Sequence, residues 1–136
     1  MAEAPRKILI SQVDIARRVR EVAGEISRDY AAGDLLLVGV LKGAFVFMAD
    51  LIREMTVPCR TDFIRAASYG AGSESAGRVA ITKDVELDVS GRDILIVEDI
   101  VDTGLTLAHI VETLRRRNPR SIKVCAFLDK RNRRKV

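Results

Sequence analysis

Apolar residues along the chain recur with two periods, one typical of helices and one typical of strands. Helical spacing runs from Val13 to Tyr30, and Ser11 with Asp14 three residues later fits a capping motif at the start of that helix. The helix is predicted to end near Gly33. Two further helices are predicted, over residues 44–55 and 105–117.

Strands are predicted between and after these helices, over residues 35–41, 59–64, 78–83, 93–98 and 121–128. The runs at 35–41 and 93–98 are continuously apolar, which indicates strands buried on both faces. Because strands alternate with helices, we expect a doubly wound α/β domain with a mainly parallel sheet and ligands at the carboxyl ends of its strands. Residues 66–78 are rich in Gly, Ser and Ala and are predicted to form a flexible loop.

Length and composition indicate one compact domain over residues 1–136, with 48% hydrophobic and 31% charged residues. The two cysteines form no CxxC pair and the chain has one histidine, so neither a disulfide framework nor a zinc site is indicated. Cys59 and Cys125 are expected to be buried thiols in a reducing cytosol. No apolar run is long enough for a signal peptide or a membrane span, so a cytoplasmic location without membrane attachment is predicted.

The net charge of +4 comes from one terminal segment. Five basic residues lie between Lys130 and Lys135, and without them 18 basic residues remain against 19 acidic ones. This segment is predicted to be a solvated tail, and nucleic acid is not an expected partner. A second basic cluster, Arg115 to Arg120, ends the last predicted helix, where cations complement the negative end of the helix dipole.

Candidate chemistry follows the buried strand at 93–98. Glu98, Asp99 and Asp102 lie within five residues, and Gly104 then opens a helix. Glycine permits a tight turn, Thr103 can cap the helix, and free backbone N–H groups there form a cradle for a phosphate. Adjacent carboxylates repel one another unless they face a cation or accept hydrogen bonds, which a phosphorylated sugar with Mg²⁺ supplies. For the short sequence DTG alone, an ordinary acidic surface turn would be the better interpretation.

The full pattern around this loop is more specific. Four aliphatic residues, two acids, two aliphatic residues and DTGLT, over residues 94–106, resemble the phosphoribosyl diphosphate loop of the type I phosphoribosyltransferases. The stretch VGVLKGAFVFMADL and the tripeptide SYG are similar to the hypoxanthine/guanine members of that family, and the similarity runs from about Ile8 to the C-terminus. The resemblance implies that a 6-oxopurine attacks C1 of phosphoribosyl diphosphate, giving a nucleoside monophosphate and pyrophosphate.

The same resemblance implies roles for the loop residues. Asp102 would be the general base for the proton on purine N7. Glu98 and Asp99 would hold the ribose hydroxyls, directly or through Mg²⁺ and water. The remaining positions of the loop would bind substrate, with the last four enclosing the 5-phosphate: Ile100, Val101, Thr103, Gly104, Leu105 and Thr106.

Three other segments carry implied roles. The turn Leu41–Lys42–Gly43 would bind the diphosphate, with a cis peptide bond between Leu41 and Lys42. Ser68 and Tyr69 would belong to a lid that closes over the diphosphate and excludes water. The ammonium group of Lys130 would donate to O6 of the purine, which favours hypoxanthine or guanine over adenine. His109 is predicted to be an ordinary residue of a helix face.

Members of this family continue beyond the position of Val136 with a segment that completes the base site, so the chain is expected to lack that C-terminal base-binding segment. The resemblance also implies a homodimer or homotetramer. Two alternatives stay open: a phosphoribosyltransferase for another base, and an RNA-binding regulator on the same fold. The second would show steeply salt-dependent RNA binding.

Overall fold

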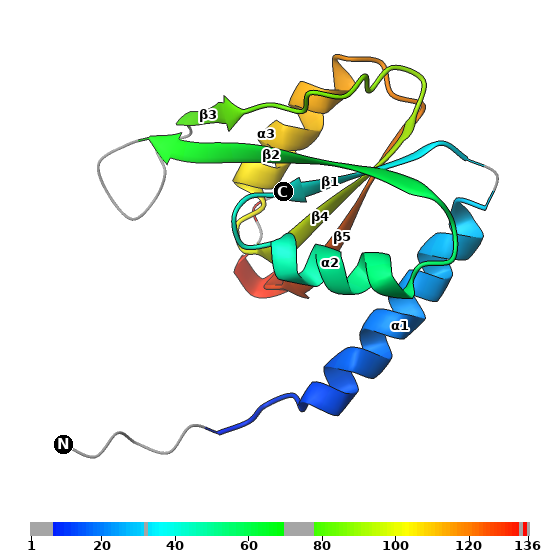
Figure 1. Cartoon of the computed structure of the whole chain (residues 1–136). Helices are drawn as coiled ribbons and strands as arrows, with labels where there is room; N and C mark the ends of the chain where they lie inside the picture. Colours follow the sequence, from blue (N-terminus) through cyan, green and yellow to red (C-terminus); the bar gives the residue numbers. More distant parts are fainter. Residues whose placement is uncertain (1–6, 32, 70–77, 134, 136) are drawn as a thin grey trace.

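The computed structural model describes residues 7–31, 33–69, 78–133 and 135. Its elements are α1 (Gln12–Asp29), β1 (Leu35–Val40), α2 (Phe45–Glu54), β2 (Cys59–Tyr69), β3 (Arg78–Lys83), β4 (Asp93–Val101), α3 (Leu105–Arg115), β5 (Ser121–Asp129) and the 3₁₀ helix η1 (Arg131–Arg133). The sheet has the strand order β3-β2-β1-β4-β5. β1 pairs in parallel with β2 and β4, β4 pairs in parallel with β5, and β3 is antiparallel to β2. The predicted mainly parallel α/β fold is confirmed (Figure 1).

Two apolar clusters fill the space on the two faces of the sheet. Successive side chains of a strand point to opposite faces, so Leu35 and Leu37 of β1 pack with α1 and α2, while Leu36 and Val38 pack with α3. All six residues of β1 are buried. Because β1 is the central strand and both of its faces are covered, its sequence is apolar throughout rather than alternating.

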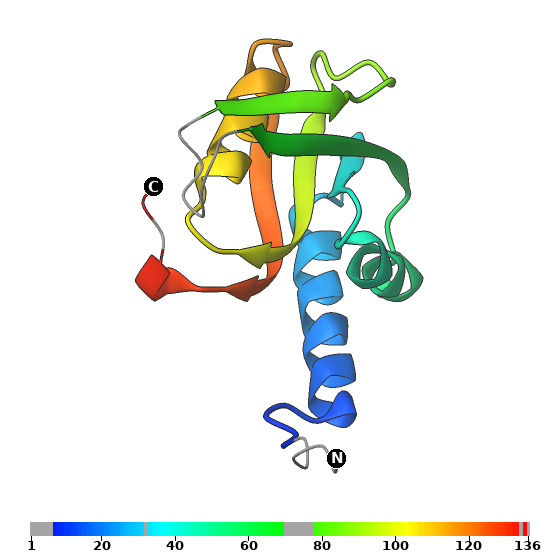
Figure 2. The same cartoon turned by 90° about the vertical axis from the view of Figure 1, so that its left-hand side faces the viewer.

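The start of α1 follows the sequence prediction. Ser11 is the N-cap, and the backbone N–H of Asp14 donates to its Oγ over 3.1 Å. The helix continues to Asp29, and its N-terminal half extends beyond the sheet (Figure 2). The exposed side chains at this end of the molecule include the apolar ones of Ile10 and Val13.

Two strands are longer than the sequence pattern indicates. β2 continues through Ala66 to Tyr69, so residues 66–69 are strand and the predicted flexible loop at 66–78 is wrong at this end. β3 starts at Arg78, and residues 70–77 lie outside the described residues. Small residues have little strand preference of their own, but the antiparallel partner β3 satisfies their backbone groups. β4 likewise extends past Glu98 to Val101 because it pairs with β5.

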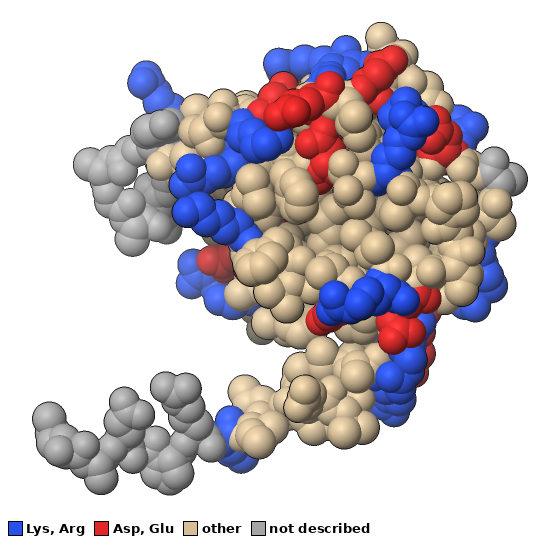
Figure 3. Space-filling model, viewed as in Figure 1, with Lys and Arg blue, Asp and Glu red and all other residues tan. Residues whose placement is uncertain are grey.

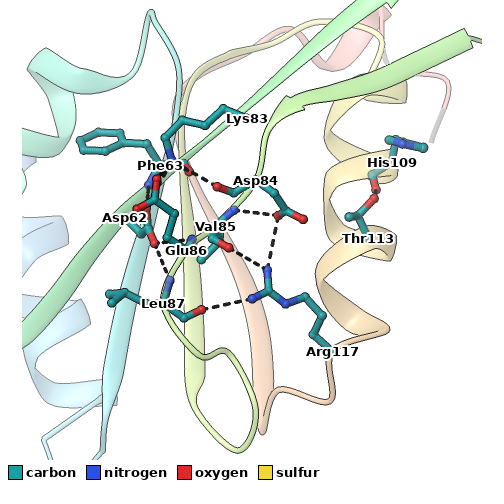
Figure 4. A network of polar contacts seen from close by, with 10 residues as sticks. All are labelled: Asp62, Phe63, Lys83, Asp84, Val85, Glu86, Leu87, His109, Thr113 and Arg117. Carbon is teal, nitrogen blue, oxygen red and sulfur yellow. Dashed lines mark hydrogen bonds and ion pairs between the residues drawn. The ribbon is translucent and has the colours of Figure 1, made fainter.

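A polar network holds the connection between β3 and β4 (Figure 4). Asp62 of β2 accepts the backbone N–H groups of Glu86 at 2.8 Å and Leu87 at 2.9 Å. Arg117, just after α3, donates to the carbonyl oxygens of Val85 and Leu87 over 3.1 and 3.2 Å. Burial raises the pKa of Asp62, but these amides and the nearby ammonium of Lys83 outweigh it, so the pKa lies below its ordinary value.

The basic cluster at the end of α3 has structural partners. Arg117 binds the β3–β4 connection, and Arg120 forms an ion pair with Asp93. The predicted role of these cations at the helix end is therefore only part of their function. On the face shown in Figure 3, basic and acidic side chains lie next to one another along the upper and lower edges.

Both cysteines are free, and each is half-buried rather than fully buried as predicted. Burial raises the pKa of the Cys125 thiol to about 11 and also raises that of Cys59. Both side chains are therefore protonated thiols at neutral pH. Within the described part of the chain, none of the helices is long and apolar enough to cross a membrane.

Candidate active site

The segments singled out from the sequence meet at one edge of the sheet. β1, β2, β4 and β5 run in the same direction, so their carboxyl ends lie together. Each of the four strands leads directly into, or contains, residues predicted to bind substrate. These residues are Leu41–Gly43, Ser68, Tyr69, Glu98–Thr106 and Lys130.

The turn after β1 has the expected backbone. The peptide bond between Leu41 and Lys42 is cis, and the side chain of Lys42 is exposed. The N-cap of α2 is Ala44, which makes no side-chain capping bond, and the first turn of the helix has no acidic residue. The start of α2 therefore offers backbone N–H groups and the positive end of a helix dipole to an anion.

The turn after β4 opens a second helix in the same way. Gly104 has φ of 83° and ψ of −5°, a left-handed conformation that other residues adopt only at a cost. Gly104 itself is the N-cap of α3, so the prediction that Thr103 caps the helix is wrong by one position. The Thr103 hydroxyl instead accepts the backbone N–H of Leu105 over 3.3 Å. The first turn of α3, which includes Thr106, again contains no acidic residue.

Glu98 and Asp99 form a compact acidic pair at the end of β4. Only 8% of the Glu98 surface is exposed, and its Oε1 accepts the backbone N–H of Asp99 over 3.0 Å. The Asp99 carboxylate in turn accepts the N–H of Ile100 over 2.8 Å. Burial, followed by a hydrogen bond with the Asp99 carboxylate and its negative charge, raises the pKa of Glu98 to about 8. The pair therefore holds a proton at neutral pH.

Replacing Glu98 with glutamine is expected to stabilise the protein at high pH. Between 4.5, the ordinary pKa, and about 8 the folded chain binds a proton that the unfolded chain has lost, so stability decreases as pH rises. A glutamine cannot ionise and removes this loss. We expect Glu98→Gln to raise the free energy of unfolding by about 2 to 4 kcal/mol at pH 9 and to change it little near pH 4.

The measurement is denaturant unfolding of both proteins at pH 4, 7 and 9 in EDTA, which removes divalent cations. Glu112→Gln is the matched control, because the Glu112 side chain is 70% exposed. If the free energy of unfolding differed between Glu98→Gln and the wild type by the same amount at every pH, the raised pKa of Glu98 would be contradicted.

Asp99 also contacts the turn after β1. A Cβ atom placed on Gly43 would lie 2.1 Å from Oδ2 of Asp99 and 2.6 Å from its Cγ. Both residues border a cavity of about 420 Å³, together with Ile100, Val46 and Phe127. Sequence reasoning assigned Gly43 and Asp99 to separate ligand groups and missed that the two segments touch.

Asp102 lies at the bend between β4 and α3, with its side chain half-exposed. Nε of Arg133 donates to its Oδ1 over 2.7 Å. The described residues of the basic tail are exposed, as predicted, but three of them form η1, from which Arg133 contacts the acidic loop. Only the charge of the tail was visible in the sequence, and nothing there pointed to this contact.

The other predicted residues have simpler surroundings. Ser68 and Lys130 are exposed at the carboxyl ends of β2 and β5. His109 lies in the second turn of α3, where its carbonyl oxygen accepts the Thr113 hydroxyl over 2.8 Å (Figure 4). This agrees with the prediction that it belongs to the helix.

The acidic pair suits a magnesium ion that is shared with a substrate. Among the described residues, no group of three or more His, Cys, Asp or Glu side chains could hold a metal by itself. Mg²⁺ characteristically binds one or two carboxylates and completes its shell with water and substrate oxygens. Glu98 and Asp99 fit this type of site.

The mainly parallel sheet, with two helix N-termini and an acidic pair at the carboxyl ends of its strands, has the type I phosphoribosyltransferase fold. Residues 8–136 match the phosphoribosyl transferase domain family. The chain belongs to the phosphoribosyltransferase family.

Relatives and solved structures agree on the branch of the family. The chain is 44% identical over 131 residues to hypoxanthine-guanine phosphoribosyltransferase of Aquifex aeolicus, an alignment that covers 96% of this chain and 74% of that protein. It is 46% identical over 130 residues to the Bacillus subtilis protein of the same name, covering 96% and 72%. A crystal structure of a hypoxanthine phosphoribosyltransferase from Staphylococcus aureus matches with a TM-score of 0.92 at 39% identity, covering 96% and 71%. The resemblance seen in the sequence is confirmed.

Proposed function

We propose that this chain transfers the phosphoribosyl group of phosphoribosyl diphosphate to a 6-oxopurine, hypoxanthine or guanine, giving IMP or GMP and pyrophosphate. The observation that carries the proposal is the turn after β4. It combines the buried Glu98, its half-buried neighbour Asp99, Asp102, and the open N-terminus of α3 at the edge where the turn after β1 also lies. The relatives that bear the names of this activity support it.

Two helix N-termini bind the 5-phosphate and the diphosphate of the sugar substrate. The 5-phosphate lies at the start of α3, against the backbone N–H groups from Gly104 onward and the hydroxyls of Thr103 and Thr106. The diphosphate lies at the start of α2, where Lys42 supplies a cation and Gly43 lets the ligand approach the backbone. Neither helix has an acidic residue in its first turn, which favours binding of an anion at the N-terminus of each.

Glu98 and Asp99 hold the ribose hydroxyls, directly or through Mg²⁺ and water. When bound, the ion neutralises charge on the departing pyrophosphate. Glu98 loses its proton as the cation or a hydroxyl donor arrives, because a nearby positive charge favours the ionised carboxylate.

Asp102 is the general base. As a purine ring nitrogen forms a bond with C1 of the sugar, the bond from C1 to the pyrophosphate oxygen breaks, and the carboxylate accepts the proton on N7. Ile100 and Val101 complete the loop beside the substrate, and Leu105 contributes its backbone amide. Ser68 and Tyr69, at the carboxyl end of β2, belong to a lid that excludes water from the reaction.

The first experiment is an initial-rate assay with phosphoribosyl diphosphate and Mg²⁺ against hypoxanthine, guanine, xanthine, adenine and uracil, after the intact mass is recorded. We expect turnover of hypoxanthine or guanine. Turnover of uracil or adenine in their place would contradict the proposed base class. Absence of turnover with every base would contradict the proposed transferase activity.

Lys130→Ala is expected to impair use of the 6-oxopurine and to leave binding of phosphoribosyl diphosphate unchanged. The ammonium group of Lys130 donates to O6 of the purine, so its loss leaves that acceptor without a partner. We expect kcat/KM for the 6-oxopurine to fall about 10- to 100-fold, with the dissociation constant of phosphoribosyl diphosphate unchanged in calorimetry. Lys123→Ala, which removes an exposed lysine of β5, the strand that leads to Lys130, is the control. If Lys130→Ala weakened phosphoribosyl diphosphate binding as much as it lowered kcat/KM for the 6-oxopurine, this role would be refuted.

We also propose that the protein is a homodimer or homotetramer and works in the cytoplasm. Phe45 and Val46 of α2 expose 59% and 56% of their surface, and Val13 of α1 exposes 77%. Phe45 and Val46 are adjacent in the chain, and exposed apolar patches mark interaction sites. Light scattering coupled to size exclusion measures the subunit number directly.

A further inference from the structure

The chain after β5 returns to the acidic loop and contacts it on both sides of Asp102. The backbone N–H of Lys130 donates to the carbonyl oxygen of Val101 over 2.8 Å, and that of Lys135 donates to the carbonyl oxygen of Thr103 over 2.7 Å. Figure 2 shows this segment beside the connection between β4 and α3. The backbone of residues 101–103 is therefore held by the segment after β5, which includes the short helix η1.

Arg133 reaches Asp102 from the middle of this segment. Its backbone N–H donates to the carbonyl oxygen of Lys130 over 2.9 Å, which closes η1 and directs the side chain to the loop. Its Nε donates to Oδ1 of Asp102 over 2.7 Å, a distance typical of a charge-assisted hydrogen bond. One carboxylate oxygen is thereby held and the other is left for a ligand.

The pair contributes little to stability. The side chains of Arg133 and Asp102 are 65% and 47% exposed, and ion pairs of this kind are screened by solvent. The orientation of the Asp102 carboxylate instead affects the reaction rate, because a general base must lie within hydrogen-bond reach of the proton it accepts. An aspartate at a bend can rotate its carboxylate freely unless a partner holds it.

We propose that Arg133 is a positioning residue for the transfer reaction: it holds Oδ1 of Asp102 so that the second oxygen faces N7 of the purine. This inference rests on the proposed function. It assigns to the basic tail a part in the chemical step, which its composition alone does not indicate. Arg133 touches Asp102 and acts through it.

The chain offers a matched control in the same short helix. Nε of Arg131 lies 3.6 Å from Oδ2 of Asp129, and this arginine is 82% exposed. Arg131→Met therefore removes one cation of η1 and leaves the contact with Asp102 in place. The comparison with Arg133→Met separates the positioning effect from the general loss of positive charge.

The experiment measures kcat and KM for both substrates in the wild type, Arg131→Met, Arg133→Met and Arg133→Lys. We expect Arg133→Met to lower kcat about tenfold while KM for phosphoribosyl diphosphate stays within about twofold. Arg133→Lys should recover part of the loss because it keeps a donor near Asp102. In the background of Asp102→Asn, Arg133→Met should have no further effect, because the group it positions is gone.

The outcomes separate the two proposals. An active wild type with equal kcat in Arg131→Met and Arg133→Met overturns the positioning role alone. A tenfold loss that also appears in the Asp102→Asn background overturns it too, since the arginine would then act elsewhere. A wild type that turns over none of the purines overturns the proposed function and this inference with it.

Discussion

Asp102→Asn is expected to lower kcat for hypoxanthine or guanine by about 100- to 10,000-fold, the usual contribution of a positioned general base. Asparagine has the size of aspartate but cannot accept the N7 proton. The Asp102 side chain is half-exposed at the end of β4, so the fold should tolerate the change. The measurement is the initial rate at saturating concentrations of both substrates, with affinity for phosphoribosyl diphosphate determined separately by calorimetry.

Glu112→Gln on α3 is the control for loss of one negative charge at the surface. It should leave kcat and the melting temperature unchanged. An Asp102→Asn protein with more than a tenth of the wild-type kcat would show that the carboxylate is no general base. A variant that has also lost its affinity for phosphoribosyl diphosphate would assign Asp102 to sugar binding instead.

Gly43→Ala is expected to disrupt the site through a single methyl group. The added Cβ would lie 2.1 Å from Oδ2 of Asp99, so either the carboxylate or the turn after β1 must move. Displacing binding groups by about 1 Å can cost roughly 100-fold in rate. We therefore expect kcat/KM for phosphoribosyl diphosphate to fall by about that factor, because both the turn after β1 and the acidic pair are affected.

Gly24→Ala is the matched control. Gly24 lies in α1, and a Cβ there would have its nearest contact, the end of the Arg28 side chain, at 3.5 Å. Alanine is the better helix former by about 1 kcal/mol, so this variant should be at least as stable as the wild type and equally active. Normal kcat/KM in Gly43→Ala would mean that Asp99 can leave the turn without consequence for binding.

The two largest effects differ in how they could be found. Asp102 was identified from a contiguous pattern, since the acids, Gly104 and the threonines all lie within nine residues of one loop. The expected loss of activity in Gly43→Ala follows from the close approach of two turns that come after different strands. A motif shows what a loop can bind, whereas the neighbour of that loop depends on the strand order.

The extension of β2 is a similar case. Residues 66–69 have the composition of a loop, and only pairing with β3 makes them a strand. The register that places Ser68 opposite Val79 cannot be inferred from either segment alone. In the same way, Asp62 is an ordinary strand residue in the sequence but holds the β3–β4 connection through backbone amides more than twenty positions away.

The sequence by itself determined the order of helices and strands, the buried character of β1 and β4, and the loop of acids, Gly104 and threonines for which phosphate binding is proposed. These features depend on periodicity and on residues close together in the chain. The tertiary structure decided the contact of Gly43 with Asp99, the raised pKa of Glu98, and the bond from Arg133 to Asp102 across 31 positions. Burial, and contact between distant segments, exist only once the sheet has set which strands are neighbours.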